Sequence, residues 1–211
     1  MGSELERIKD AVVAGKRDQV VAIVQEALNG GLSATRIMTE SLIPAMNVVG
    51  EKYSTGEFFL PQMMIAARAM DEALPILRPH LAQGNYKKKA KAVVGTVQGD
   101  FHDIGKNIVK MMMEGAGYEV IDLGVDVTAD AFIKTIRNES PKFVLLSALI
   151  TLTMDSMKKI VEAIDHAGLR GKVLIGVGGA PVTQKFANEI GADFYADDAH
   201  GCVSNCNRLT A

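Results

Sequence analysis

The sequence predicts a chain of two parts, a helical part over residues 1–88 and a doubly wound α/β part over residues 89–211. Up to about residue 85, apolar residues recur at intervals of three and four, which is typical of amphipathic helices. From residue 90 onward, short apolar runs alternate with helical patterns, which is typical of βαβ units on a parallel sheet. The 211 residues are enough for one large or two modest domains.

The helical part is expected to begin with two helices. Apolar residues mark one face of each along "LERIKDAVVAGKRDQVVAIVQEALNGG". Asp18 is a candidate N-cap of the second helix, and Gly30-Gly31 is a candidate stop. The apolar residues that mark the two faces are Leu5, Ile8, Val12, Val20, Ile23, Val24 and Leu28.

Two further helices complete a bundle of about four. The third is expected to begin near Ser33, whose hydroxyl can cap it, and to run towards Tyr53. Pro44 is expected to kink or restart this helix because proline lacks the N–H that a helix interior needs. The fourth is expected to begin around Pro61 and to continue until Pro79. The polar segment "AQGNYKKK" then joins the bundle to the α/β part.

Five strands are expected in the α/β part, and the first four are nearly all apolar. Such strands suit a sheet that is covered on both faces. A last helix is expected near Asp198. Five strands and five helices in about 120 residues suit a flavodoxin-like (Rossmann-like) sheet, whose ligands lie beyond the carboxyl ends of the strands. The five apolar runs are "KAVVGTV", "GYEVIDLGV", "KFVLLSALI", "KVLIGVGG" and "ADFYA".

Charge and cysteine content exclude several classes of protein. The formal net charge of −2 gives no general attraction to nucleic acid or to an anionic membrane. The N-terminus has no signal-peptide core, and no stretch reaches the ~20 apolar residues that span a bilayer, so we expect a cytoplasmic protein. The two cysteines, Cys202 and Cys206, suit neither a disulfide framework nor a zinc site, because no second ligand pair accompanies them.

The segment "TVQGDFHDIGKN" lies between the first strand and its helix and places Asp100 two residues before His102. At this spacing the carboxylate can accept a hydrogen bond from one ring nitrogen and leave the other nitrogen as a metal ligand. No companion histidine or cysteine lies nearby, so a four-ligand zinc site fits poorly. A metal held by a macrocycle needs only one protein ligand, and Gly105 permits close approach of a bulky group. The alternative is that His102 is a surface residue; Asp103 is interpreted as a first-turn helix carboxylate.

The hexapeptide "DFHDIG" resembles the Asp-x-His-x-x-Gly motif of cobalamin-binding domains. The resemblance extends to "LLSALITLT", which contains Ser147 and Leu149, and to "IGVGGAP". The segment "GEKYSTGEFFLPQMMIAARAMDEALPIL" is similar to the helical cap that precedes this domain in methionine synthase. In size and layout the chain resembles the corrinoid proteins of anaerobic methyltransferase systems, which handle methylamines, methylated betaines, methanol or aryl methyl ethers.

The resemblance implies that cobalamin or a related corrinoid is bound base-off, His-on, with His102 as the lower axial ligand of cobalt. Asp100 and Thr153 would form a relay behind His102, and Ser147 would face the benzimidazole. Thr151 would lie near the lower corrin face, and Gly178 and Gly179 against the nucleotide tail. The residues implied at the cofactor are Gly99, Asp100, Phe101, His102, Asp103, Ile104, Gly105, Ser147, Leu149, Ile150, Thr151, Thr153, Gly176, Gly178, Gly179 and Ala180.

Simpler roles remain open for several of these residues. Gly178 and Gly179 could simply form a strand-to-helix turn. Thr151 and Thr153 could simply cap the helix that begins before Asp155. In the helical part, Phe59, Met63 and Met70 are implied as a cover of the upper cobalt face, because soft side chains suit a surface that repacks. The alternative is that they form the core of the bundle.

The implied function is that of a methyl carrier. Reduced cobalt is a strong nucleophile that accepts a methyl group from nitrogen or oxygen. The sequence has no nucleophile elbow, paired catalytic carboxylates or phosphate loop, so it is not expected to be an enzyme on its own. The implied partners are a substrate-specific methyltransferase, a second methyltransferase that uses tetrahydrofolate or a thiol, and a reductive activation protein.

Three alternatives share part of this pattern. A cobalamin-dependent sensor or regulator would have both parts but would need an output element, and the sequence shows no basic recognition face. A subunit of an adenosylcobalamin mutase would lack the helical cap. A plain flavodoxin-like or receiver domain would explain the sheet but not the cap or the motif.

Overall fold

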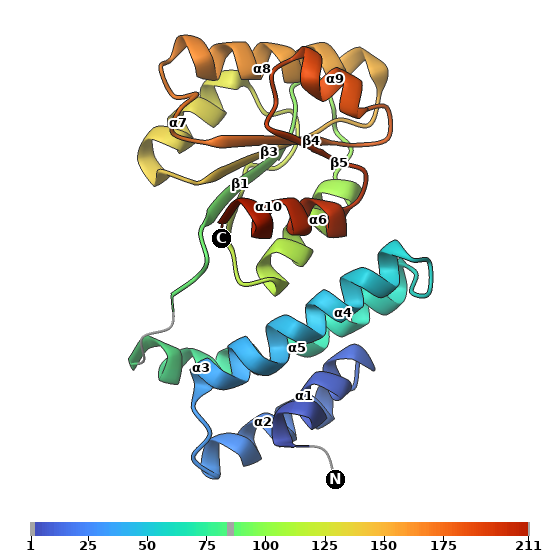
Figure 1. The fold of residues 1–211 in the computed structure, drawn as a ribbon, viewed down its shortest axis with the longest axis vertical. Helices are drawn as coiled ribbons and strands as arrows, with labels where there is room; N and C mark the ends of the chain where they lie inside the picture. Colours follow the sequence, from blue (N-terminus) through green and yellow to red (C-terminus); the bar gives the residue numbers. More distant parts are fainter. Residues whose placement is uncertain (1–2, 84–86, 211) are drawn as a thin grey trace. The chain divides into compact units, whose positions relative to one another are not determined.

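The computed structural model describes residues 3–83 and 87–210 of the 211-residue chain. The chain forms two compact units, one helical and one α/β, which divide between Lys87 and Lys88, except that the short segment Gly115–Gly117 is grouped with the helical unit (Figure 1). The architecture confirms the predicted fold class. The polar joining segment includes residues 84–86, which lie outside the described residues.

The helical unit contains the expected bundle of helices. Ser3 caps the first helix in a capping box with Glu6, and Ser33 caps the third, as predicted, by accepting a hydrogen bond from the Arg36 amide. Gly30 ends the second helix, which confirms the predicted stop. The elements are α1 (Glu4–Val13), α2 (Arg17–Asn29), α3 (Ala34–Ile37), a π-helical turn η1 (Met38–Leu42), α4 (Ile43–Ser54) and α5 (Leu60–Gln83).

Three local predictions for the helical unit concern Pro44, Pro79 and Asp18. Pro44 lies in the first turn of α4, just after the π-helical turn, and the backbone stays helical through Leu42 and Ile43, so the irregularity predicted at Pro44 takes the form of a π-helical turn and not of a break. The predicted end at Pro79 is wrong, because α5 continues through it to Gln83. Proline fits the helical φ and removes one hydrogen bond, and burial of apolar residues such as Leu77 offsets this loss. The predicted cap at Asp18 is also wrong, because Asp18 lies inside the first turn of α2.

The α/β unit is a five-stranded parallel sheet in the described residues, with strand order β2-β1-β3-β4-β5. Helices α7, α8 and α9 cover one face of the sheet, and α6 and α10 cover the other (Figure 1). The order is that of a flavodoxin-like fold. The elements are β1 (Lys91–Thr96), α6 (Ile104–Gly115), β2 (Glu119–Asp122), α7 (Ala129–Glu139), β3 (Phe143–Ser147), the 3₁₀ turn η2 (Thr151–Thr153), α8 (Met154–His166), β4 (Leu174–Gly178), α9 (Gln184–Glu189), β5 (Phe194–Ala196) and α10 (Ala199–Thr210).

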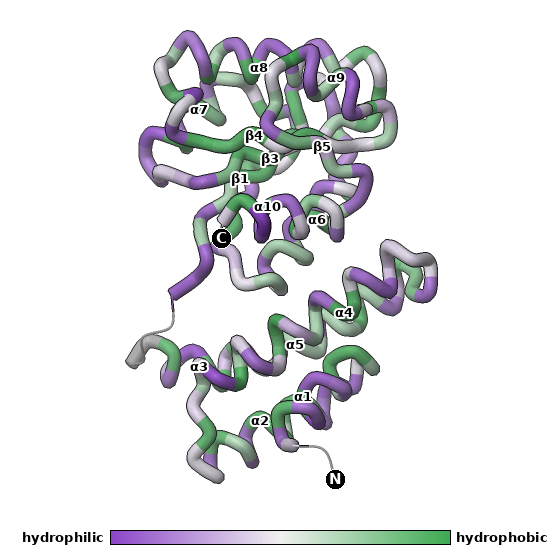
Figure 2. The backbone as a smooth tube through the Cα atoms, viewed as in Figure 1, coloured by the Kyte–Doolittle hydropathy of each residue, from purple (hydrophilic) through white to green (hydrophobic). Residues whose placement is uncertain are grey.

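The strands are buried because both faces of the sheet are covered. Figure 2 shows β1, β3 and β4 as mainly hydrophobic segments, and all but the first residue of β1 is buried. The core between the sheet and helices α7 to α9 includes Val93, Phe132, Val144, Ile160 and Ile175. This agrees with the continuous apolar runs from which the strands were predicted.

The register brings the carboxyl ends of the strands to one edge of the sheet. Thr96 pairs with Ser147, Ser147 pairs with Gly178, and Gly178 pairs with Ala196. The loops that follow β1, β3 and β4 therefore leave the sheet at the same edge. The strand order reverses between β1 and β3, which is where doubly wound sheets bind ligands. Among the described helices, none is both long and apolar enough to cross a membrane.

Candidate functional site

The loop after β1 begins with a tight turn that separates a buried residue from an exposed one. The Asp100 amide donates to the Val97 carbonyl at 3.1 Å, which closes a four-residue turn. Gly99 occupies the third position with φ +87°, the conformation that a type II turn requires there. Two residues later, the Thr96 hydroxyl donates to the His102 carbonyl at 2.8 Å and ties the loop to the end of β1.

Asp100 is 1% exposed and accepts four hydrogen bonds. Its Oδ1 accepts from the His102 Nδ1 at 2.7 Å and from the His102 amide at 3.1 Å. Its Oδ2 accepts from the Leu149 amide at 2.7 Å and from the Thr153 hydroxyl at 2.8 Å. Burial alone would raise the pKa of Asp100, but the donors, led by the Leu149 amide, hold this pKa well below its usual range. Asp100 is therefore a charged carboxylate with both oxygens occupied.

The charge on Asp100 fixes the tautomer of His102. An ionised carboxylate only accepts hydrogen bonds, so the ring proton of neutral His102 lies on Nδ1 and the lone pair lies on Nε2. The side chain of His102 is 54% exposed, whereas that of Asp100 is fully covered. The arrangement presents a basic nitrogen at the surface and a fixed charge behind it, which is how proteins orient a metal-binding imidazole.

Thr153 belongs to a different segment but completes the environment of Asp100. It directly precedes α8, yet its side chain makes no capping hydrogen bond to that helix. Its hydroxyl instead lies 2.8 Å from Asp100 Oδ2 and 2.9 Å from the Ile150 carbonyl. A hydroxyl has one proton, and the carboxylate is the stronger acceptor. The alternative of a helix cap is therefore wrong for Thr153; Thr151, which begins η2, is exposed.

Apolar side chains are exposed around His102. The described residues include seven exposed large apolar side chains, and five of them lie in the two segments that meet at Asp100. Concentrated apolar exposure of this kind marks a binding surface. The five residues, here called the apolar rim, are Phe101, Ile104, Leu149, Ile150 and Leu152.

The glycines near the carboxyl ends of the strands differ in how much space surrounds them. A Cβ at Gly105 would meet no atom within 4 Å, so the space beside the His102 loop is open. A Cβ at Gly178 would lie 2.8 Å from the Ala196 carbonyl oxygen. At Gly179, where φ is +121°, a Cβ would lie 1.8 Å from the Ala148 carbonyl oxygen. Backbone crowding alone therefore requires glycine at both positions, and the predicted place of the nucleotide tail against this pair stays a prediction.

The remaining predicted site residues are not among the hydrogen-bond donors to Asp100. Asp103 directly precedes α6, and its carboxylate accepts a hydrogen bond from the Asn107 side chain at 3.1 Å, which suits a helix-start residue. Gly176 is buried in β4, where a Cβ would lie 2.3 Å from the Phe194 ring. Ser147 is half-buried at the end of β3, and Ala180 is exposed.

The three residues expected to cover the cobalt differ in exposure. Phe59 is 67% exposed in the turn before α5. Met63 and Met70 lie inside α5 and are 0% and 3% exposed. Their burial agrees with the alternative that the two methionines are core residues, and it leaves Phe59 as the accessible member of the set.

A buried ion pair beside the loop was missed by the sequence analysis. Lys106, in the first turn of α6, is 2% exposed, and its Nζ lies 2.7 and 2.8 Å from the two carboxylate oxygens of Asp122. Asp122 also accepts from the Gly124 amide, and burial, which raises its pKa, is outweighed by these donors, so the pKa is lowered. The available signal was a carboxylate at the end of an apolar strand, because strand ends meet at the binding edge.

The donor set fits a metal cofactor that needs one protein ligand. Among the described residues, no three histidine, cysteine or acidic side chains are placed to hold a metal ion together. His102 is thus a single donor with an oriented lone pair, next to open space at Gly105 and inside the apolar rim. These features suit a large, mainly apolar macrocycle whose metal has an axial position to fill.

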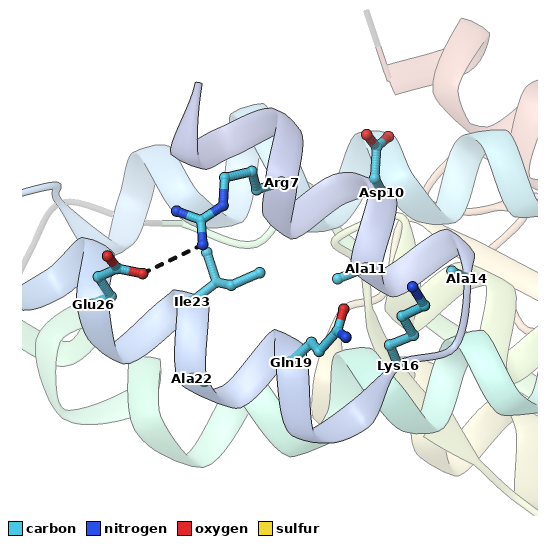
Figure 3. Close-up of a pocket in the computed structure, with 9 residues that line it drawn as sticks. All are labelled: Arg7, Asp10, Ala11, Ala14, Lys16, Gln19, Ala22, Ile23 and Glu26. Atoms are coloured by element: carbon cyan, nitrogen blue, oxygen red, sulfur yellow. Dashed lines mark ion pairs between the residues drawn. The ribbon is translucent and has the colours of Figure 1, made fainter. Parts of the chain in front are cut away.

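A cavity in the helical unit has a different character. It has a volume of about 580 Å³ and lies between α1 and α2, where Arg7 and Glu26 form an ion pair at 3.5 Å (Figure 3). Its lining is mixed polar and aliphatic, and no predicted site residue contributes to it. The cavity is therefore separate from the Asp100 cluster.

Comparison with known proteins gives consistent results for both units. Two family models, each described as a B12 binding domain, match residues 90–201 and 4–78. The chain is 40% identical over 208 residues to the dimethylamine corrinoid protein of Methanosarcina barkeri, covering 98% of this chain and 97% of that protein. It is 38% identical over 210 residues to a corrinoid protein of Desulfitobacterium hafniense, covering 98% and 97%.

Two solved structures are similar along nearly the whole chain. A cobalamin-binding protein from Desulfitobacterium hafniense has a TM-score of 0.84 and 31% identity, with 98% of both chains covered. A chain of the methanol:cobalamin methyltransferase complex from Methanosarcina barkeri has a TM-score of 0.87 and 30% identity, with 98% of this chain and 79% of that chain covered. The matches confirm the predicted resemblance and the expected class of cofactor.

Proposed function

Because the chain belongs to the family of B12-binding domains, we propose that it is a corrinoid methyl carrier that binds cobalamin base-off, His-on, through His102. The observation that carries this proposal is the buried, charged Asp100, which holds the Nδ1 proton of His102 and leaves Nε2 as an exposed ligand. A surface histidine without this role would need neither a covered carboxylate nor three further donors to that carboxylate.

The residues around His102 have separate tasks in this proposal. Asp100 and Thr153 orient the imidazole and maintain its basicity. The apolar rim would cover apolar surface of the bound corrin and remove it from water. Gly105 leaves the space that a side chain would occupy beside the cofactor. Phe59 is the candidate for contact with the upper face from the helical domain, which we place at residues 1–88, with the cobalamin domain at 89–211.

The chain serves as a carrier that works with other proteins. When bound, cobalamin supplies a cobalt centre that accepts a methyl group in its reduced state and yields it to a second acceptor. The chain's own residues hold, shield and present this centre, and the substrate is activated by a separate methyltransferase. We propose as partners a substrate-specific methyltransferase, a second one using tetrahydrofolate or a thiol, and a reductive activation protein, all in the cytoplasm. Relatives are named dimethylamine and trimethylamine corrinoid proteins, so methylamines are the first donors to test.

The visible spectrum of the loaded protein tests the ligation. Wild type loaded with cobalamin is expected to show a base-off, His-ligated spectrum, and His102→Ala is expected to show an unligated lower face while it still binds. His166→Ala is the matched control, because His166 is exposed in the last turn of α8. An unchanged His-ligated spectrum in His102→Ala would contradict the proposal.

A second experiment separates a carrier from an enzyme. The loaded and reduced chain alone is expected to demethylate methylamines no faster than free cobalamin, and a cognate methyltransferase is expected to restore turnover. Rapid demethylation by the chain alone would show that substrate activation resides in this protein.

A further inference from the structure

We propose that Asp126, in the loop between β2 and α7, is a positioning residue that places His102 by fixing the turn before it. The inference rests on the proposed function, because it concerns the residue that would bind cobalt. Neither the motif nor the spacing within it points to Asp126, which follows β2 and lies 24 positions beyond His102 in the sequence.

Asp126 makes two hydrogen bonds to adjacent residues of the turn. Its Oδ1 accepts from the Gly99 amide at 2.7 Å. Its own amide donates to the Asp100 carbonyl at 3.0 Å. The same turn is closed by the bond from the Asp100 amide to the Val97 carbonyl at 3.1 Å. Asp126 therefore binds the peptide before Gly99 and the peptide after Asp100, at the point where the chain turns towards His102.

The bond to the Gly99 amide selects the type of turn. Types I and II differ mainly by a flip of the central peptide, which here joins Gln98 to Gly99. The Gly99 amide belongs to this peptide, so the carboxylate of Asp126 holds it in one of the two orientations. The φ of +87° at Gly99 is the type II value. Without the acceptor, the central peptide is free to flip, and the path of the chain towards Asp100 and His102 changes.

The backbone of Asp126 is itself in an uncommon conformation. Its φ is +55°, and among the described residues the only other non-glycine residue with positive φ is Ser140, at +47°. Ser140 follows the end of α7, a usual place for this conformation. Asp126 ends no helix. A residue with a side chain keeps a left-handed backbone where its surroundings determine it, and such residues concentrate at functional sites.

Asp126 and Asp122 together hold both ends of the His102 loop. Asp126 binds at Gly99 and Asp100, before the histidine, and Asp122 binds Lys106, after it. Both carboxylates belong to the end of β2 and the loop that follows it. Of the two, Asp126 acts on the turn that leads into the Asp100–His102 pair. Replacement of Asp126 is therefore expected to change the position of His102 more than the stability of the fold.

The test compares Asp126→Gly, Asp126→Asn and the control Ser140→Gly. Glycine adopts φ +55° without strain, so Asp126→Gly removes the acceptor while the fold is kept. Asparagine tolerates the same φ and keeps an oxygen that can accept from the Gly99 amide. Asp126→Asn is therefore expected to lie between Asp126→Gly and wild type. Ser140→Gly relieves a left-handed residue away from the turn, and it is expected to behave as wild type in both readouts.

The first readout needs no cofactor. Amide hydrogen exchange at Gly99 is expected to be faster in Asp126→Gly by about two- to tenfold, the factor that corresponds to a typical net hydrogen bond. The second readout is the ratio of His-ligated to unligated cobalamin, taken from the visible spectrum and from the nitrogen splitting in the paramagnetic resonance spectrum of the Co(II) form. This ratio is expected to fall by a similar factor, with Asp126→Asn between glycine and wild type.

The outcomes separate this inference from the proposed function. If wild type shows no His-ligated cobalamin, the proposed function fails, while the exchange at Gly99 still reports on the turn. If wild type is His-ligated and Asp126→Gly keeps the wild-type ratio, Asp126 does not position His102 and the inference is overturned. The inference is also overturned if Asp126→Asn lowers the ratio of His-ligated to unligated cobalamin as much as Asp126→Gly does. It is overturned as well if the control Ser140→Gly lowers this ratio to the same extent.

Discussion

Replacement of Asp100 by asparagine is expected to move the ring proton of His102 from Nδ1 to Nε2. Each oxygen of Asp100 accepts two donors, from the ring and amide of His102 on one side and from Leu149 and Thr153 on the other. Asparagine has one oxygen and one NH₂ group, so the NH₂ must face one of these pairs of donors. The Leu149 amide lies at 2.7 Å and the His102 amide at 3.1 Å, so the oxygen is expected to face Leu149. The NH₂ then faces the imidazole, which can accept at Nδ1 only as the other tautomer.

The size of the effect follows from the hydrogen bond that is lost. A hydrogen bond to a charged group contributes about 1.5–3 kcal/mol. The ring of His102 is 54% exposed, so the lower end of this range, about 1.5 kcal/mol, applies. That value corresponds to a tautomer ratio of roughly ten to one in favour of Nδ1–H in wild type. In the variant the ratio is expected to reverse, because Nδ1–H would face an NH₂ group.

Nitrogen NMR of the histidine rings measures this ratio in the protein without cofactor. In mildly alkaline buffer, where imidazole is neutral, protonated and unprotonated ring nitrogens have distinct resonances. Wild type is expected to show a protonated Nδ1 at His102, and Asp100→Asn a protonated Nε2 with correspondingly poor cobalt ligation. The exposed His166 provides an internal control, since its resonances are expected to stay unchanged. A variant that retains the proton on Nδ1 would refute the assigned role of Asp100.

Three further predictions concern neighbouring residues. Thr153→Val is expected to destabilise the protein by about 1 kcal/mol in urea unfolding, because Asp100 loses one donor, while Thr153→Ser keeps the hydroxyl and stays near wild type. Gly105→Ala is expected to stabilise the cofactor-free chain against thermal unfolding by up to about 1 kcal/mol, because position 105 is helical and has open space around it. The same variant is expected to bind cobalamin about tenfold more weakly in a titration, and equal affinity would place the corrin elsewhere. The pKa of Asp122 is lowered in the folded protein, so its carboxylate stabilises the fold at pH values above its unfolded pKa of about 3.9. This contribution is lost as the pH falls through the pKa of the folded state. The stability difference between wild type and Asp122→Asn is therefore expected to shrink on acidification.

Local patterns determined much of this protein. The alternation of apolar runs with helical patterns was enough to predict the sheet, because strands covered on both faces must be apolar throughout. Caps such as Ser33 and stops such as Gly30 were predictable, since they act on residues within four positions. The spacing of Asp100 and His102 was also local, and it gave the correct hydrogen-bonded pair. Where neighbours in sequence are neighbours in space, periodicity and spacing are sufficient.

Tertiary structure decided what surrounds that pair. Thr153 reaches Asp100 from 53 positions away, and it does so only because the register aligns the ends of β1 and β3. Asp126 acts through the orientation of a single peptide, which no residue pattern records. Helix α5 passes through Pro79 because burial of its apolar face outweighs one lost hydrogen bond. These features depend on distances between segments and on the balance of burial against local preference, and both are fixed only when the chain is folded.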